Sequence, residues 1–166
     1  MNEQILEQLE IVFNEIYSAY SKMADLYEEK KEALIKMNPD ALKLTDDLIL
    51  ETHSLLVDLN NERLRIVQQL GVDEMNISEI IEEAEKINCS LAEEFKNFKV
   101  KFNEVSKKIT LLEQTNVELI KHGLTMSNKV LDIIIQACTP QSTGYDCHGK
   151  NSQGSDMGIS SVCEDA

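Results

Sequence analysis

The stretch LAEEFKNFKVKFNEVSKKITLLEQTNVELIKHGLTMSNKVLDIIIQAC, residues 91–138, places an apolar residue at alternating steps of four and three. The seam positions are Leu91, Phe95, Phe98, Phe102, Val105, Ile109, Leu112, Asn116, Leu119, Gly123, Met126, Val130, Ile133 and Ala137. A 3.5-residue repeat held this long is typical of a helix that supercoils around partner helices. Asn116 and Gly123 interrupt the seam: a buried amide costs stability but fixes register, and glycine gives up about 1 kcal/mol of helix propensity. We therefore predict one helix roughly 70 Å long, at 1.5 Å per residue.

A second heptad pattern covers residues 2–37, with Lys30 as its one charged intrusion. Its seam consists of Leu9, Val12, Ile16, Ala19, Met23, Leu26, Ala33 and Met37, and beside it lie Leu6, Phe13, Tyr20, Tyr27 and Leu34, seven residues apart. A stripe this wide can contact two neighbours, which favours a bundle over a two-stranded zipper. Asn38-Pro39 predicts the end of this helix and the capped start of the next.

The second helix is predicted to run from Pro39 to Leu70, with Gly71 as its left-handed C-cap residue. Its predicted inner face consists of Leu42, Leu48, Ile49, Leu55, Leu56, Leu59, Ile66 and Leu70. The motif Asn76-Ile77-Ser78-Glu79 predicts a capped short helix to about Asn88, and the sequence leaves open whether that helix continues into the long one. The predicted fold is all-α, an elongated antiparallel three-helix coiled-coil bundle with a short extra helix.

The character of the chain changes after Cys138. Thr139-Pro140 ends the helical pattern, and residues 139–166 are rich in glycine and serine with few large apolar side chains. Such a segment buries too little surface to offset its ordering entropy. We predict a helical domain at 1–138 and a flexible, disordered C-terminal tail at 139–166.

The composition is acidic, with 30 Asp and Glu against 16 Lys and Arg and a net charge of -14. This balance disfavours nucleic acid and anionic membrane as partners. The N-terminal sequence lacks the features of a signal peptide, and no run of 18 apolar residues predicts stable membrane insertion. We expect a soluble, cytoplasmic protein.

No constellation of residues predicts catalysis. The Glu-x-x-His pairs of a di-iron bundle are absent from the sequence, and Glu118 and His122 are four residues apart. Cys138, Cys147, His148 and Cys163 are spaced by 9 and 16 residues between successive cysteines, which matches no structural zinc pattern. We therefore expect no enzyme activity, no metal and no cofactor, and we expect the cysteines to be free thiols.

The long helix becomes more apolar beyond Asn116. Additional apolar residues lie outside the seam, namely Val117, Ile120, Leu124, Leu131, Ile134, Ile135 and Cys138. The first two helices, roughly 50 Å each, cannot cover roughly 70 Å, so about a third of the long helix should project beyond the turn at residue 38. A soluble monomer rarely exposes such a patch unless it binds a partner, although self-association or folding back of the tail would also cover it. The candidate partner-binding residues are Leu124, Val130, Leu131, Ile134, Ile135 and Tyr145.

Several motifs, in this order and spacing, resemble the FlgN family of flagellar export chaperones over residues 1 to about 150. They are the turn near residue 38, Arg63 and Arg65 before Leu70-Gly71, Asn76-Ile77-Ser78-Glu79, Asn116-Val117-Glu118-Leu119-Ile120 and Tyr145-Asp146-x-x-Gly149-Lys150. The resemblance implies a cytoplasmic, non-enzymatic chaperone that holds hook-filament junction proteins unassembled and hands them to the flagellar type III export gate. It places substrate binding on residues 124–150.

One departure from the family pattern is Cys147-His148, where small polar residues are more usual, and it keeps a metal or thiol role open. We expect a chaperone that is monomeric when free. The alternative function is a structural coiled-coil module that homodimerises through its exposed end and has no export client.

Overall fold

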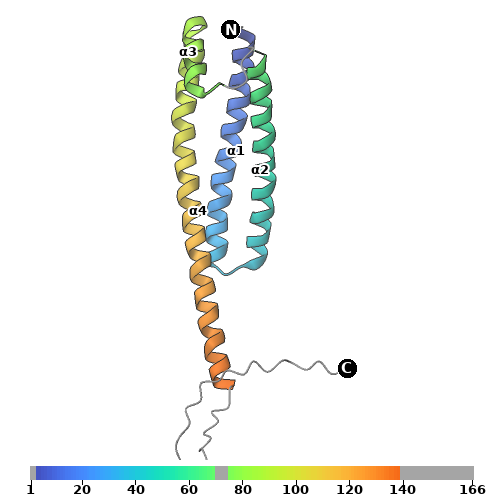
Figure 1. Cartoon of the computed structure of the whole chain (residues 1–166), viewed down its shortest axis with the longest axis vertical. Helices are drawn as coiled ribbons and strands as arrows, with labels where there is room; N and C mark the ends of the chain where they lie inside the picture. Colours follow the sequence, from blue (N-terminus) through green and yellow to red (C-terminus); the bar gives the residue numbers. More distant parts are fainter. Residues whose placement is uncertain (1–2, 70–74, 139–166) are drawn as a thin grey trace, which may run out of the picture. The chain divides into compact units, whose positions relative to one another are not determined.

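The computed structural model describes residues 3–69 and 75–138, which form four α-helices and no strand (Figure 1). They are α1 (Glu3–Ile35), α2 (Pro39–Gln68), α3 (Ile77–Ile87) and α4 (Cys89–Cys138). The predicted all-α fold is confirmed. The chain divides into two compact units, Met1–Leu124 and Thr125–Ala166, which we describe separately. Gly71 and the predicted tail lie outside the described residues.

The turn between α1 and α2 is a Schellman-type cap followed at once by an N-cap. The Met37 N–H donates to Leu34 O at 3.2 Å and the Asn38 N–H donates to Ala33 O at 3.0 Å, with Met37 at φ 51°. The Asn38 side chain then accepts a bond from the Ala41 N–H at 3.1 Å, and Pro39 begins α2. These bonds satisfy end groups of both helices, so the chain reverses within a few residues and α2 runs antiparallel to α1.

The α2 face against α1 is built partly from threonine. Its buried side chains are Thr45, Thr52, Leu59, Ile66 and Val67. Each threonine hydroxyl donates to a main-chain carbonyl of its own helix, as Thr52 does to Leu48 O at 2.8 Å. The predicted inner face was wrong at Leu55, which is 47% exposed, because small side chains instead line the interface and allow the two helices to lie close together.

Lys30 is tolerated in the α1 seam because it pairs with α2. Its Nζ atom lies 2.6 Å from Asp46 Oδ1, and the lysine side chain is only 19% exposed. The aliphatic stem can pack along the interface while the ammonium group reaches the carboxylate at the rim. Met37, also predicted in this seam, is instead 86% exposed because it lies in the turn after α1.

The short helix α3 is separate from α4. Asn76 forms a capping box with Glu79, as predicted, and Asn88 breaks the helix in an extended conformation at φ -149° and ψ 108°. The Asn88 N–H closes α3 on Ala84 O at 2.8 Å, while its side-chain oxygen accepts from the Ser90 N–H at 3.0 Å and caps α4. One asparagine thus ends one helix and begins the next.

Polar contacts between α3 and α4 run in reverse order along the two helices. Glu85 pairs with Lys96, and farther from the break Ser78 accepts a bond from Lys99 Nζ at 2.9 Å. The two helices therefore form an antiparallel hairpin around Asn88. Figure 1 shows α3 beside the first turns of α4.

The hydrophobic core of the first unit draws on all four helices. Its most deeply buried side chains include Leu6, Leu9, Val67, Ile80, Ala84 and Phe95. Aromatic contacts join α1 to α4, with ring centroids 5.6 Å apart for Phe13 and Phe95 and 4.8 Å apart for Tyr20 and Phe102. Because the paired residue numbers rise together, α4 runs parallel to α1, as predicted.

Candidate functional site

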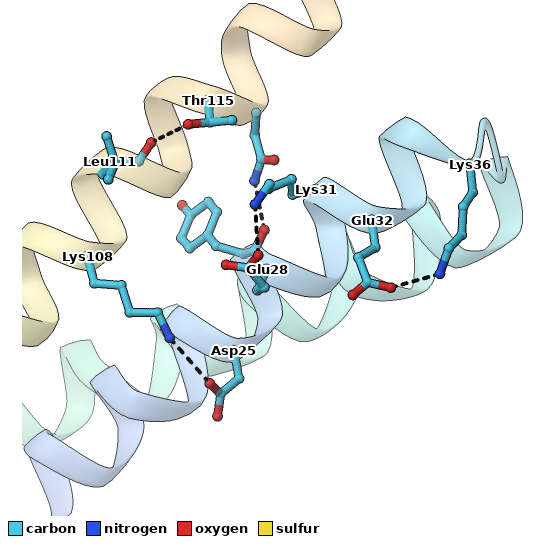
Figure 2. A network of polar contacts seen from close by, with 10 residues as sticks. Asp25, Glu28, Lys31, Glu32, Lys36, Lys108, Leu111 and Thr115 are labelled. Carbon is cyan, nitrogen blue, oxygen red and sulfur yellow. Dashed lines mark hydrogen bonds and ion pairs between the residues drawn. The ribbon is translucent and has the colours of Figure 1, made fainter.

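The burial of α4 side chains ends at Asn116. Leu112 is 6% exposed and Asn116 is 2% exposed, whereas every side chain from Ile120 to Cys138 is exposed. Near this limit Lys108 Nζ approaches Asp25 Oδ1 of α1 at 3.9 Å, and Thr115 donates a local hydrogen bond to Leu111 O at 2.8 Å (Figure 2). The structure thus locates the exposed part of the helix that the length argument predicted.

The end of α1 explains why burial stops there. Tyr20 contacts Phe102, and the Tyr27 carbonyl accepts a bond from Asn116. We extend to Ile35 the differences in residue number found in these two contacting pairs. Ile35, at the end of α1, then lies level with residues 117–124 of the parallel helix α4. The helix α4 contains 50 residues, against 33 in α1 and 30 in α2, so within the first unit α1 ends near the limit of α4 burial.

The helical part of the second unit, residues 125–138, divides into an apolar and a polar side. We call its apolar residues the α4 apolar face: Met126, Val130, Leu131, Ile133, Ile134, Ile135, Ala137 and Cys138. At 100° per residue they span an arc of about 200°, within which Ser127 is the one polar residue. The other residues, Thr125, Asn128, Lys129, Asp132 and Gln136, share the remaining arc of about 100°. Six large side chains of the apolar face are between 48% and 64% exposed.

The sequence-predicted binding residues fall into three groups. Val130, Leu131, Ile134 and Ile135 lie together on the α4 apolar face. Leu124 is 60% exposed and is the last residue of the first unit, while Tyr145 lies outside the described residues. Met126 and Ile133 lie on the same face but were not among the residues predicted to bind a partner, because the heptad pattern assigned them to the buried seam. The continuation of the seam beyond the predicted end of α1 was the signal that could have identified them.

Titratable and thiol groups also lie elsewhere on the described helices. Burial and a hydrogen bond with Glu94 raise the pKa of Glu10 at the junction of α1 and α4. Within residues 3–69 and 75–138, no cluster of His, Cys, Asp and Glu side chains is arranged to hold a metal ion. Cys89 and Cys138 are exposed free thiols, and Cys147, His148 and Cys163 fall outside the described residues.

None of the described helices combines the length and the apolar character needed to cross a membrane.

Comparison with known families identifies the family of this chain. The model of the family described as FlgN protein matches residues 1–153, which includes all four helices. The chain belongs to the FlgN family. FlgN proteins are flagellar export chaperones, so the recognition made from the sequence motifs is confirmed. FlgN is a family of chaperones and not a known family of enzymes.

One curated protein with a similar sequence is described as a kinesin-like protein and not as an export chaperone. The kinesin-like protein KIN-5B of Arabidopsis thaliana is 27% identical over 135 residues, which cover 77% of this chain but 13% of that protein. Heptad repeats give coiled-coil segments similar sequences whatever the protein does. This likeness therefore fits the helical periodicity and does not assign a motor function. No solved structure matches the chain.

Proposed function

We propose that this FlgN-family chain binds hook-filament junction proteins, also called hook-associated proteins, through the α4 apolar face. It would keep these clients unassembled in the cytoplasm and deliver them to the flagellar type III export apparatus. The family supports an export chaperone in general. The observation that favours this surface is a helical segment whose large apolar side chains are about half exposed over residues 126–135.

The chemistry of the surface suits an amphipathic helix as the bound segment. Burying one Leu or Ile side chain contributes about 1.5–3 kcal/mol, and a few such anchors supply most of the energy of a helix-in-groove contact. Leu131 and Ile134 are 54% and 52% exposed, so both have surface left to bury. A client helix held there is unavailable for assembly with other subunits.

Residues on either side of the α4 apolar face are also proposed to contact the client. We propose that Leu124 extends the client contact at one end and that Tyr145 adds a contact from the tail. Export gate components are proposed as the second class of partner, after the client is bound. The free chain is proposed to be a monomer.

Affinity capture of purified hook-filament junction proteins from the same organism tests the proposal. The test variant combines Leu131→Asp with Ile134→Asp, and the matched control combines Asn128→Asp with Gln136→Asp on the polar side of the same segment. We expect the test variant to lose capture by at least about tenfold because it removes two anchors and places charges in the contact. The control should retain capture, whereas a chain ending at Pro140 should bind the client more weakly than the full chain because it lacks the contact proposed for Tyr145.

The melting temperature and sedimentation of each variant complete this experiment. Both double variants should keep the melting temperature of the wild type within a few degrees, because all four positions are exposed. Undiminished capture by the test variant would contradict the proposal. A wild-type dimer that captures no junction protein and dissociates in the test variant would instead support the homodimerising coiled-coil module.

A further inference from the structure

We propose that the α4 apolar face accepts two helices of the client at once, so that residues 125–138 become one helix of a three-helix coiled coil. This inference rests on the proposed function, because it concerns how the client is held. The apolar face is wider than the arcs of α4 that contact other helices of the chain.

A contact of α4 with one helix uses a narrow arc. Over residues 105–116 α4 packs against α1, with Lys108 near Asp25 and Asn116 bonded to Tyr27. Figure 1 shows α1 between α4 and α2. The apolar α4 side chains that are at least partly buried here are Val105, Ile109 and Leu112, and the buried Asn116 lies in line with them. These four positions span an arc of only about 60°.

A contact of α4 with two helices uses a wider arc. In its first turns α4 packs against α1 through Phe95 and Phe13, and against α3 through Lys99 and Ser78. The α4 residues that pack in this part of the core are Leu91, Ala92, Phe95, Phe98 and Phe102. They span an arc of about 120°, twice the width found where α1 is the neighbour.

The α4 apolar face is wider than either of these internal contacts, at about 200°. Leu131 and Ile133 lie near opposite edges of it, about 160° apart around the helix axis, and Ile134 lies between them. One bound helix could cover Ile134 and one edge, but it would leave Leu131 or Ile133 in water. Two helices cover both edges, each contacting one edge, and both contact Ile134.

The charged residues of the segment lie away from the α4 apolar face, so neither edge of that face carries a charge. Lys129 and Asp132 both lie in the polar arc of about 100°, on the opposite side of the helix from Ile134. The proposed occupant is therefore a pair of amphipathic client helices whose facing seams are apolar, with no requirement for a charged anchor.

Titration calorimetry with the full chain and a purified hook-filament junction protein tests this arrangement. The variants are Leu131→Asp at one edge, Ile133→Asp at the other, Ile134→Asp at the centre and Gln136→Asp as the polar-side control. We expect each of the first three to weaken binding by at least about tenfold and the control to stay within about threefold. Circular dichroism should show unchanged helix content, and Leu131→Ser and Ile133→Ser repeat the edge test without added charge.

The outcomes separate this inference from the proposed function. If Ile134→Asp loses binding while one edge variant binds like the wild type, the client supplies a single helix, and the inference is overturned while the function stands. If all four variants bind like the wild type, both are overturned. Sedimentation of the free wild-type chain should show a monomer. If it shows a trimer, and either edge variant dissociates that trimer, then other copies of the chain supply the two helices and the inference is overturned.

Discussion

Asn116 of α4 donates a hydrogen bond from its Nδ2 atom to the main-chain carbonyl of Tyr27 in α1, at 3.0 Å. The Oδ1 atom of the same side chain is buried and has no partner among the residues that the structure describes. A buried acceptor left unpaired costs about 1–3 kcal/mol. In coiled coils an amide in the seam contributes by fixing the alignment of the helices, and here it lies where burial of α4 ends.

Replacing Asn116 with Leu should raise the free energy of unfolding by about 1–2 kcal/mol, because an unpaired polar atom is exchanged for an apolar side chain in the seam. Chemical denaturation measures this gain. Asn128→Leu is the control, since Asn128 is exposed on the same helix and its replacement should change stability little. A lower stability for Asn116→Leu would show that the bond to Tyr27 outweighs the cost of the unpaired atom.

Met37→Gly should stabilise the turn between α1 and α2. Met37 has φ 51° and is 86% exposed, so it bears the strain of a left-handed conformation while burying little surface. Glycine adopts this conformation freely, and the expected gain is about 1 kcal/mol. Thermal unfolding tests it, with Ile35→Gly as a control that should destabilise the last residue of α1. A lower melting temperature for Met37→Gly would contradict the capping account.

Phe95→Ala should cost about 3–5 kcal/mol of stability, because it removes a large side chain from the centre of the core. Phe95 is 1% exposed, and its ring meets that of Phe13 at 5.6 Å. Val100→Ala on the same helix is the matched control, since Val100 is 58% exposed and should change stability by no more than about 0.5 kcal/mol. Equal effects of the two substitutions in urea unfolding would contradict the described packing of α4 on α1.

Glu10→Gln should stabilise the protein at neutral pH and lose that advantage in acid. Burial, then the hydrogen bond and repulsion from Glu94, raise the pKa of Glu10 above its ordinary value of 4.5. The folded protein therefore binds the proton more tightly than the unfolded chain, so this group destabilises the fold above the raised pKa and ceases to do so below 4.5. Unfolding at a series of pH values should show a gain below about 1 kcal/mol that disappears on acidification. A gain that persists unchanged in acid would contradict this cause.

Local signals in the sequence were sufficient to predict the turn between α1 and α2 and the start of α3. Asn38-Pro39 and Asn76 with Glu79 act through bonds within a few residues, and the structure contains both caps. Asn88 was harder to interpret because an exposed asparagine can lie within a helix or break it. The hairpin that it forms depends on α3 packing back along α4, which is a tertiary effect.

The inner face of α2 was predicted less well than that of α1. Hydrophobicity favoured Leu55, but the interface buries Thr45 and Thr52, whose hydroxyl groups bond to carbonyls of their own helix. A small side chain with an internally satisfied hydroxyl is apolar enough to pack closely. No ranking of single residues by hydrophobicity detects this.

The candidate site could be predicted in composition but not in extent. The heptad pattern continues through Met126 and Ile133, and a periodic pattern does not tell whether a partner helix is present to cover it. The burial of each side chain along α4 supplied that information. The approximate length of each helix could be calculated from the sequence, which is why Leu131 and Ile134 were identified beforehand.

The most direct measurement of the central claim is hydrogen–deuterium exchange of the chain with and without a bound hook-filament junction protein. We predict that binding slows exchange in peptides covering residues 125–138 and leaves Pro39–Gln68 of α2 unchanged, and that the Leu131→Asp, Ile134→Asp double variant shows no such slowing. Slower exchange on α2 with residues 125–138 unaffected would contradict the account.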